Sequence, residues 1–238
     1  VSELTGDARL EQLVGCTVGK YRLLRILGQG GMGMVYLAER VDGLLSKQVA
    51  IKLLYPSVSA ALGDGRAHQE VMLLSKLNHP NIVKVFDAGF TDEGWQYFVM
   101  EYIEGETLKD YLEKKGKLNS EEVGGLLEQM LSALEYAHEQ GLVHRDIKPS
   151  NFMVSPQGKL KLLDFGIAKQ TNTASAEYTI TGTNQRMGTA MYMSPEQIHE
   201  TKSVTPRSDI YSLGVVLWQM VTGMKPYSTE TLSAFQLQ

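Results

Sequence analysis

The octapeptide HRDIKPSN constrains this chain most, together with a DFG tripeptide whose aspartate lies thirteen residues after the octapeptide's asparagine. The two blocks contain Asp146, Lys148, Asn151 and Asp164. Asp146 can accept a proton from an attacking hydroxyl group, and Lys148 can neutralise charge on a phosphoryl group in transit. Asn151 and Asp164 carry oxygen ligands of the kind that Mg²⁺ prefers. Each residue alone is ordinary, but the combination at this spacing is specific and predicts a centre for phosphoryl transfer.

A glycine-rich segment precedes these blocks and matches the pattern GxGxxGxV. Predicted strands flank it on both sides, which favours a flap over nucleotide phosphates and disfavours a Rossmann turn, where a helix follows. Glycines in such a flap let backbone N–H groups approach phosphate oxygens closely. Taken alone, the motif fits a flexible hairpin equally well. The residues assigned to nucleotide binding here are Leu27, Gly28, Gln29, Gly30, Gly31, Met32, Gly33, Met34 and Val35.

The sequence VAIK, residues 49–52, lies on a predicted strand and places Lys52 about one hairpin after the flap. An isolated lysine on a strand is usually a solvated charge, but here its ammonium group can reach the phosphates of a nucleotide. Glu70 lies on the next predicted helix, four residues before the inward-facing Leu74. An ion pair with Glu70 would hold Lys52 in position. Without Lys52, the better interpretation of Glu70 is a solvated helix charge.

Hydrophobic periodicity predicts a β-rich first part of the chain and a helical part after Gly105. A helix is expected to begin near residue 121, with Asn119 or Ser120 as its cap and Glu122 in a capping box. Residues 170–186 have almost no large apolar side chains, which predicts a long functional loop. The expected strands are 21–27, 34–39, 48–54, 82–86 and 97–100, and the other expected helices are 67–77, 108–112 and 209–222.

Together these blocks resemble the eukaryotic-type (Hanks-type) protein kinase family, in its order and spacing, from about Tyr21 to the end of the chain. The sequences GGMG at 30–33 and HPNIV at 79–83 are most similar to the bacterial serine/threonine branch. The resemblance implies an α+β, two-lobed protein kinase fold. Its expected parts are an N-terminal leader at 1–20, a small β-rich N-lobe at 21–103 and a mainly helical C-lobe at 104–238.

The resemblance also implies that the C-lobe is incomplete at its C-terminus, because the family normally continues for several more helices. One of those helices carries an arginine that pairs with the glutamate matched here by Glu196. An uncovered apolar surface would favour self-association or a homodimer.

For the nucleotide, the resemblance implies ATP bound with Mg²⁺, and Mn²⁺ as a substitute ion. Val35 and Ala50 would form the ceiling of the adenine slot and Met153 its floor. Met100 matches the gatekeeper position, while Glu101 and Ile103 would offer backbone hydrogen bonds to adenine.

For the second substrate, the resemblance implies proteins with serine or threonine hydroxyls, because Lys148 and Thr189 match the serine/threonine group. Thr189 would bond Asp146 and Lys148 and shape the substrate groove. Arg145 precedes the aspartate that matches the catalytic residue, and a phosphothreonine on the long loop is expected to neutralise its guanidinium group.

Counting back from Thr189 gives Thr181 and Thr183 as the sites of autophosphorylation, with Thr179 and Thr173 as weaker candidates. The alternative is that the loop is rich in threonine because it is disordered.

Composition excludes several other classes of protein. The formal net charge is −4 and there is no polybasic cluster, so neither nucleic acid nor a membrane surface is an expected partner. Cys16 is the only cysteine, which indicates a reducing compartment, and no apolar run is long enough to span a bilayer. A cytoplasmic chain is expected, and a membrane-anchored parent protein with a sensor domain stays open.

Two alternatives to an active Ser/Thr protein kinase differ in class. A non-enzymatic nucleotide-binding scaffold, or pseudokinase, usually lacks one of the residues matched by Lys52, Asp146, Asn151 or Asp164, and all four are present. A small-molecule phosphotransferase of related fold lacks the peptide-groove signature matched by residues 188–196.

Overall fold

The computed structural model describes residues 10, 12–43, 47–56, 58, 76–165, 190–199 and 204–226. The chain divides into two compact units. The first consists of Val1–Asn78 and Lys84–Ile103, and the second of His79–Val83 and Glu104–Gln238. Strands dominate the described part of the first unit, and helices dominate that of the second. The predicted α+β fold, with a β-rich N-terminal part and a mainly helical C-terminal part, is confirmed.

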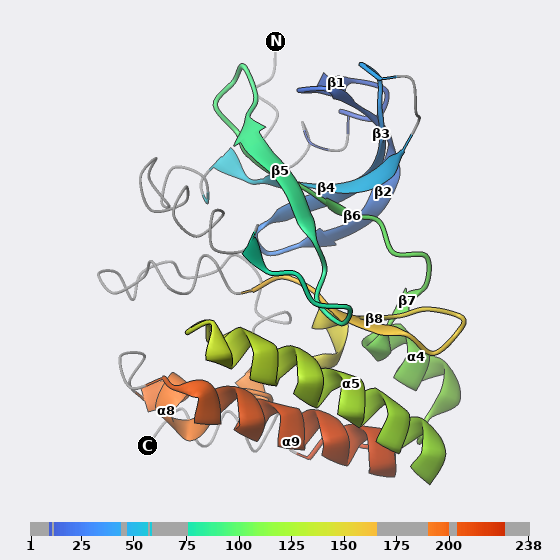
Figure 1. Ribbon diagram of the computed structural model, residues 1–238, viewed down its shortest axis with the longest axis vertical. Helices are drawn as coiled ribbons and strands as arrows, with labels where there is room; N and C mark the ends of the chain where they lie inside the picture. Colours follow the sequence, from blue (N-terminus) through green and yellow to red (C-terminus); the bar gives the residue numbers. More distant parts are fainter. Residues whose placement is uncertain are drawn as a thin grey trace. The chain divides into compact units, whose positions relative to one another are not determined.

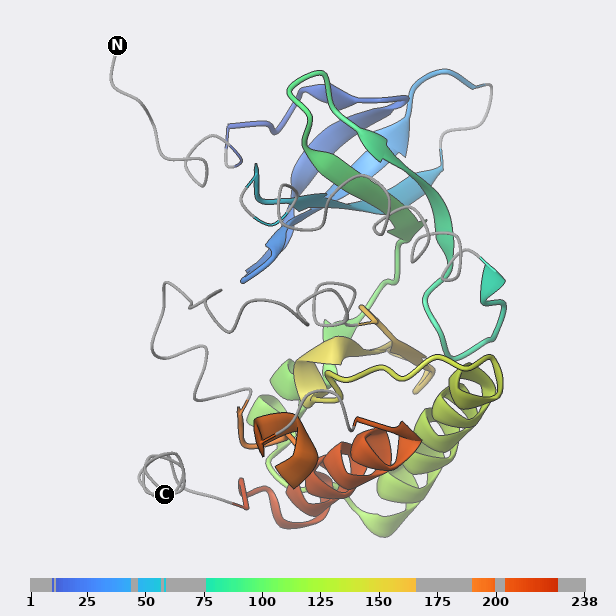
Figure 2. The ribbon, with the colours of Figure 1, turned by 90° about the vertical axis from the view of Figure 1, so that its left-hand side faces the viewer.

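The first unit contains a twisted antiparallel sheet with the strand order β1-β2-β3-β4-β6-β5 (Figures 1 and 2). Residues 17–18, which the sequence assigns to the leader, pair with the start of β2. Side chains alternate along the strands, and one face of the sheet packs into a core that includes Leu10, Tyr36 and Ile51. The strands are β1 (Thr17–Val18), β2 (Tyr21–Gly30), β3 (Gly33–Arg40), β4 (Gln48–Leu54), β5 (Val85–Phe90) and β6 (Gln96–Glu101).

The second unit combines helices with a small antiparallel sheet of strand order β7-β8-β9. Helices α5 and α9 lie side by side (Figures 1 and 2). The helices are α4 (Leu108–Lys115), α5 (Ser120–Glu139), η1, a 3₁₀-helix (Pro149–Asn151), α8 (Pro195–His199) and α9 (Pro206–Thr222). The strands are β7 (Glu106–Thr107), β8 (Phe152–Val154) and β9 (Leu160–Leu162).

Local sequence signals explain where the two long helices begin. Asn119 caps α5 and Glu122 completes a capping box, as the sequence predicts. Helix α9 begins at Pro206, three residues before its predicted start, because proline suits the first turn of a helix, where its missing N–H is not needed. It ends before Gly223, which takes the left-handed conformation with φ of 72°.

Two elements differ from the sequence prediction for physical reasons. Strand β5 begins at Val85 and not at 82, because Ile82 and Val83 pair with Leu162 of the second unit. Alternation of apolar residues shows that a segment is extended, but it does not show which strand it pairs with. The predicted helix 67–77, apart from its last two residues, and the predicted loop 170–186 lie outside the described residues. Among the helices that the structure describes, none is long and apolar enough to cross a membrane.

Candidate active site

The second unit brings together three of the residues singled out by the sequence. The Lys148 ammonium nitrogen lies 2.9 Å from Oδ2 of Asp146. The side-chain amide of Asn151 donates to the same Oδ2 at 3.0 Å and to the backbone carbonyl of Asp146 at 2.7 Å. Asp146 and Lys148 are largely buried, with side chains 13% and 21% exposed. The aspartate is therefore held by a cation and an amide, and water can screen these interactions only in part.

Short-range backbone bonds place Asp164 beside this group. The 3₁₀ turn η1 is closed by the Asn151 N–H, which donates to the Lys148 carbonyl at 2.9 Å. The carbonyl of Asn151 then accepts the N–H of Leu163 at 2.8 Å, so the backbone of the next residue, Asp164, begins next to Asn151. Asp164 has a φ of 34°, a backbone conformation that is costly for a residue other than glycine and occurs often at functional sites.

Asp209 of helix α9 supports the loop of residues 144–148, which is the expected catalytic loop. Its carboxylate is 1% exposed and accepts three hydrogen bonds. The backbone N–H groups of His144 and Arg145 donate to it at 2.8 Å each, and His138 Nε2 of α5 lies 2.8 Å from Oδ2. Arg145 has a φ of 65°, so the carboxylate holds the loop at the residue where its backbone is strained.

His144 connects the loop to the segment that carries Asp164. Its Nε2 lies 2.8 Å from the carbonyl of Leu163, and its Nδ1 accepts the N–H of Asp146 at 3.2 Å. These partners fit a neutral ring with the proton on Nε2. Complete burial lowers the pKa of His144 below its ordinary value, although nearby carboxylates act in the opposite direction. The ring also packs against Phe165, with centroids 4.9 Å apart.

Helix α8 contributes two further contacts. The side-chain amide of Gln197 donates to the Arg145 carbonyl at 2.8 Å. Glu196, whose partner in the resembled family is an arginine, accepts a hydrogen bond here from the hydroxyl of Ser208. This hydrogen bond lowers the pKa of the Glu196 carboxyl.

The first unit carries the glycine-rich segment on the β2–β3 hairpin. A Cβ added at Gly33 would lie 2.0 Å from the Leu53 carbonyl oxygen, so strand packing requires glycine there. A Cβ added at Gly28 or Gly30 would meet nothing within 4 Å. Packing inside the protein therefore explains the third glycine of the motif but not the first two.

One face of the sheet collects several residues that the sequence assigns to nucleotide binding. Val35 pairs directly with Lys52, and Ala50 pairs directly with Met100, so each pair shares a face of the sheet. Ala50 and Lys52 are two residues apart and lie on the same face. The intervening Ile51 belongs to the core on the other face.

The other residues of the glycine-rich segment differ in how they contact the rest of the first unit. Gln29 donates from its side chain to the Tyr55 hydroxyl at 2.9 Å, and the Met32 carbonyl accepts the Tyr55 N–H at 3.0 Å. The Met34 side chain is buried in the core, so only its backbone can face a ligand. Leu27 is exposed, and Gly31 lies in the turn between the two strands.

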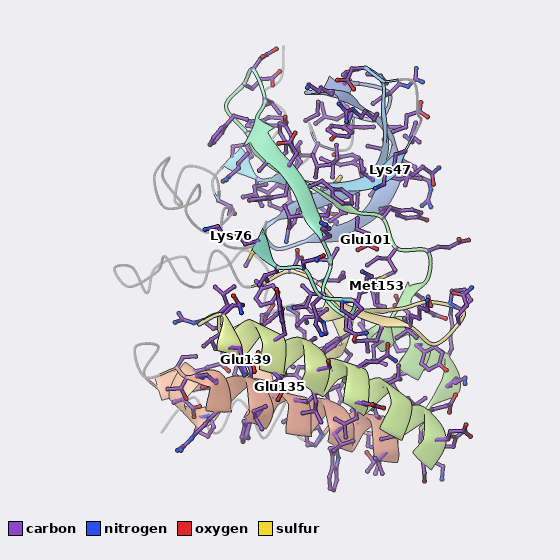
Figure 3. The ribbon with its side chains drawn as sticks, viewed as in Figure 1. Lys47, Lys76, Glu101, Glu135, Glu139 and Met153 are labelled. Atoms are coloured by element: carbon purple, nitrogen blue, oxygen red, sulfur yellow. The ribbon has the colours of Figure 1, made fainter. Side chains whose placement is uncertain are left out.

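Three expected adenine contacts lie at strand ends. Glu101 stands at the end of β6 (Figure 3). Its N–H donates to the Lys84 carbonyl at 2.9 Å, which leaves this N–H unavailable to a ligand. Ile103 follows two residues later and is partly buried. Met153 projects from β8 between its buried neighbours in the sequence and is itself partly exposed (Figure 3).

The other predicted site residues lie outside the described part of the chain. They are Glu70, Thr181, Thr183 and Thr189. Sequence reasoning missed the supporting roles of Asp209, His138 and Gln197. Only Gln197 had a local signal, because the spacing from Ser194 to Gln197 fits a capping box.

Three comparisons with known proteins agree with this geometry. The model of the "Protein kinase domain" family matches residues 21–237. The serine/threonine-protein kinase PrkC of Bacillus subtilis (strain 168) is 43% identical over 223 residues, which is 92% of this chain and 33% of PrkC. The serine/threonine-protein kinase PknA of Mycobacterium tuberculosis (strain ATCC 25177 / H37Ra) is 41% identical over 90% of this chain and 50% of PknA.

The chain thus spans a third to a half of the length of these relatives. The crystal structure of the Mycobacterium tuberculosis PknI kinase domain superposes with a TM-score of 0.70 and 28% sequence identity. That superposition covers 91% of this chain and 79% of the PknI chain.

Proposed function

Because this chain belongs to the protein kinase family, we propose that it transfers the γ-phosphoryl group of Mg·ATP to serine or threonine hydroxyls of proteins. The observation that carries the proposal is the buried group of Asp146, Lys148 and Asn151, which join through three contacts of 2.7–3.0 Å. The bacterial relatives are named serine/threonine-protein kinases, which supports the aliphatic hydroxyl of serine or threonine as acceptor over the phenolic hydroxyl of tyrosine.

The side chains fit roles in a direct in-line transfer. Asp146 accepts the proton of the attacking hydroxyl, and the two groups that hold its carboxylate keep it oriented. Lys148, already beside Asp146, places its positive charge where the phosphoryl group passes. Lys52, on the sheet face with Val35, holds the phosphates of the nucleotide.

The residues also fit a magnesium ion. Both amide hydrogens of Asn151 point at Asp146, which leaves the oxygen end of the amide to bind a cation. The adjacent Asp164 adds a carboxylate. Among the residues that the structure describes, no cluster of three or more His, Cys, Asp or Glu could hold a metal alone. Two protein oxygens suit Mg²⁺, which takes its other ligands from phosphates and water. When bound, the ion neutralises charge on the phosphates, and Mn²⁺ is expected to substitute.

The open space at Gly28 and Gly30 supports a flap over the phosphates. A side chain there would meet no part of the protein, so the small residues leave room for a ligand and for its contact with backbone N–H groups. For adenine we propose Val35, Ala50 and Met153 as its apolar neighbours and Met100 as the gatekeeper. At Glu101 the carbonyl is the group offered to adenine, because its N–H is bonded to Lys84.

We further propose that autophosphorylation of Thr181 and Thr183 activates the enzyme. The Nε atom of Arg145 is buried and has no hydrogen-bond partner among the described residues. A buried guanidinium nitrogen without a partner is unfavourable, and a phosphate group on the threonine-rich segment would satisfy it. Mapping of phosphopeptides from active enzyme tests this, and finding both threonines unmodified would refute it.

The test of the main proposal is incorporation of labelled phosphate from ATP with Mg²⁺, into the chain itself and into a generic basic protein. Asp146→Asn should abolish incorporation while ATP still binds. The matched control is Asp92→Asn, an exposed aspartate in a turn of the first unit, which should incorporate phosphate like the unmodified chain. ATP binding without any incorporation by the unmodified chain would refute the kinase proposal and favour a nucleotide-binding scaffold.

Two finer proposals concern the setting of the enzyme. The single cysteine, Cys16, and the need for ATP support a cytoplasmic location. Self-association through α9 is supported by Ile210, Trp218 and Val221, which share one helix face and are 48%, 51% and 51% exposed. Light scattering coupled to size-exclusion chromatography should detect a dimer that Trp218→Arg weakens, and a monomer at all concentrations would refute it.

A further inference from the structure

The side chain of Gln197 on helix α8 forms hydrogen bonds in two directions. Its nitrogen donates to the Arg145 carbonyl at 2.8 Å. Its oxygen accepts the backbone N–H of Ser194 at 3.1 Å and the Ser194 hydroxyl at 3.3 Å. The reverse orientation of the amide would place a donor against the Ser194 N–H and an acceptor against a carbonyl. The contacts therefore fix the orientation of the amide.

The bond to Ser194 alone does not explain a glutamine at this position. Ser194 and Gln197 have the spacing of a capping box, and in such a box glutamate and glutamine both accept the N–H of the capping residue. Helix α5 of the same chain uses glutamate, Glu122, for this purpose. Glutamate would also suit the positive end of the helix better. Only the amide has a donor left over, and here that donor reaches the catalytic loop.

The peptide group that receives this hydrogen bond leads directly into Asp146. Its carbonyl, from Arg145, is held by Gln197, and its N–H, from Asp146, donates to Nδ1 of His144 at 3.2 Å. On the other side of Arg145, the N–H is held by Asp209. Arg145 has a φ of 65°, which is unfavourable for a side-chain-bearing residue, so this peptide would rotate if it were not held.

We propose that Gln197 is a positioning residue for phosphoryl transfer, whose side-chain amide holds the peptide between Arg145 and Asp146. It links Ser194, where helix α8 begins, to the aspartate that accepts the proton. This inference rests on the proposed kinase activity, because it assigns Gln197 to the same reaction.

The test is Gln197→Glu, which preserves the length of the side chain and the acceptor for Ser194 but removes the donor to Arg145. Near neutral pH we expect kcat to fall about 10- to 100-fold, the range that a displacement on the scale of 1 Å can cause. KM for ATP should stay unchanged, because nucleotide binding is not altered. The thermal unfolding midpoint should fall only slightly, because the capping bond to Ser194 is kept and one neutral hydrogen bond is lost.

The pH dependence supplies a second readout, which a purely structural role would not move. A protonated carboxyl group at position 197 has a donor and an acceptor, as the amide has. The ratio of kcat for Gln197→Glu to kcat for the unmodified chain should therefore rise as pH falls. The matched control is Gln157→Glu, because Gln157 is exposed in the turn before β9 and the substitution makes the same change of charge. This control should show unaltered kcat and a ratio that does not depend on pH.

Amide hydrogen exchange of residues 144–146 tests the inference without relying on catalysis. Exchange at the Asp146 N–H should be faster in Gln197→Glu than in the unmodified chain, and unchanged in Gln157→Glu. Equal exchange rates, or a kcat ratio that stays near one at every pH, would overturn the inference. If the unmodified chain transfers no phosphate, the kinase proposal fails, and the exchange experiment still decides whether Gln197 holds the loop.

Discussion

Replacing Asp209 by asparagine should destabilise the second unit and impair catalysis together. The carboxylate accepts hydrogen bonds from the N–H groups of His144 and Arg145 and from Nε2 of His138, each at 2.8 Å. Oδ2 takes two of these three donors and Oδ1 takes the bond from Arg145. An asparagine can present only one oxygen, so its better orientation keeps the two bonds at the Oδ2 position and turns its NH₂ group towards the Arg145 N–H.

The expected cost follows from that one lost bond. A hydrogen bond to a charged group contributes about 1.5–3 kcal/mol, and a buried N–H without a partner costs about 1–3 kcal/mol. Both ranges describe the loss of the same hydrogen bond and are not added. We therefore expect the free energy of unfolding to fall by about 2–3 kcal/mol. Since a domain is typically stable by about 5–15 kcal/mol, the variant should still fold. Its kcat should also fall, because the lost bond releases Arg145, the strained residue before Asp146.

The assay is urea unfolding followed by circular dichroism, combined with measurement of phosphate transfer. Glu135→Gln is the control, since Glu135 is exposed on α5, which packs beside α9, and the substitution makes the same change of charge (Figure 3). The reasoning is refuted if Asp209→Asn lowers the free energy of unfolding by no more than this control does. It is also refuted if stability falls by the expected amount while kcat stays unaltered.

Three further predictions concern glycine and titratable residues. Gly33→Ala should destabilise the chain by about 1–3 kcal/mol, because its Cβ would lie 2.0 Å from the Leu53 carbonyl, whereas Gly30→Ala should spare thermal stability and weaken ATP binding in calorimetry. Burial lowers the pKa of His144 in the folded chain. As pH falls, this histidine therefore takes up its proton at a higher pH in the unfolded chain than in the folded chain, so stability should fall as pH drops below about 6.5. An NMR titration midpoint of His144 at or above 6.5 would contradict this. Burial raises the pKa of Tyr192 to about 12, so stability should fall between pH 10 and 12. Tyr192→Phe should make that decline smaller in urea unfolding, and the raised pKa values of Tyr21 and Tyr97 account for part of the decline that stays.

Much of the fold was predictable because its elements carry local signals. The capping box of α5 lies wholly within residues 119–122, and the run of aliphatic residues along 48–54 predicts β4 with both bounds correct. Strands β7, β8 and β9 were not predicted, since each has only two or three residues and shows no usable period. Residues 82–83 pair across to β9, and a sequence pattern contains no information about such a distant partner.

The candidate site likewise contains residues that a local motif marks and residues that no local motif marks. The residues that we propose to act on phosphate lie in short motifs at fixed spacing. Asp146, Lys148 and Asn151 could therefore be singled out from the sequence, and they are close together in the structure. The residue that supports their loop, Asp209, lies 65 and 64 positions after His144 and Arg145, whose N–H groups it accepts. A single aspartate in the first turn of a helix is an ordinary residue at that position, so no local pattern marks it as a partner of the catalytic loop.

The energetics of Arg145 explain why such distant support is needed. A left-handed backbone at this residue costs about 1–3 kcal/mol. The hydrogen bonds that the N–H groups of His144 and Arg145 donate to Asp209 are charge-assisted and together contribute about 3–6 kcal/mol. The neutral bond from Gln197 adds about 0.5–1.5 kcal/mol. The support exceeds the strain, so the conformation that presents Asp146 is the ground state of the loop and need not be induced by substrate. Without Asp209 the remaining bond from Gln197 no longer covers the strain, so this conformation of the loop is lost. Without Gln197 the loop stays folded, but the peptide before Asp146 is free to rotate.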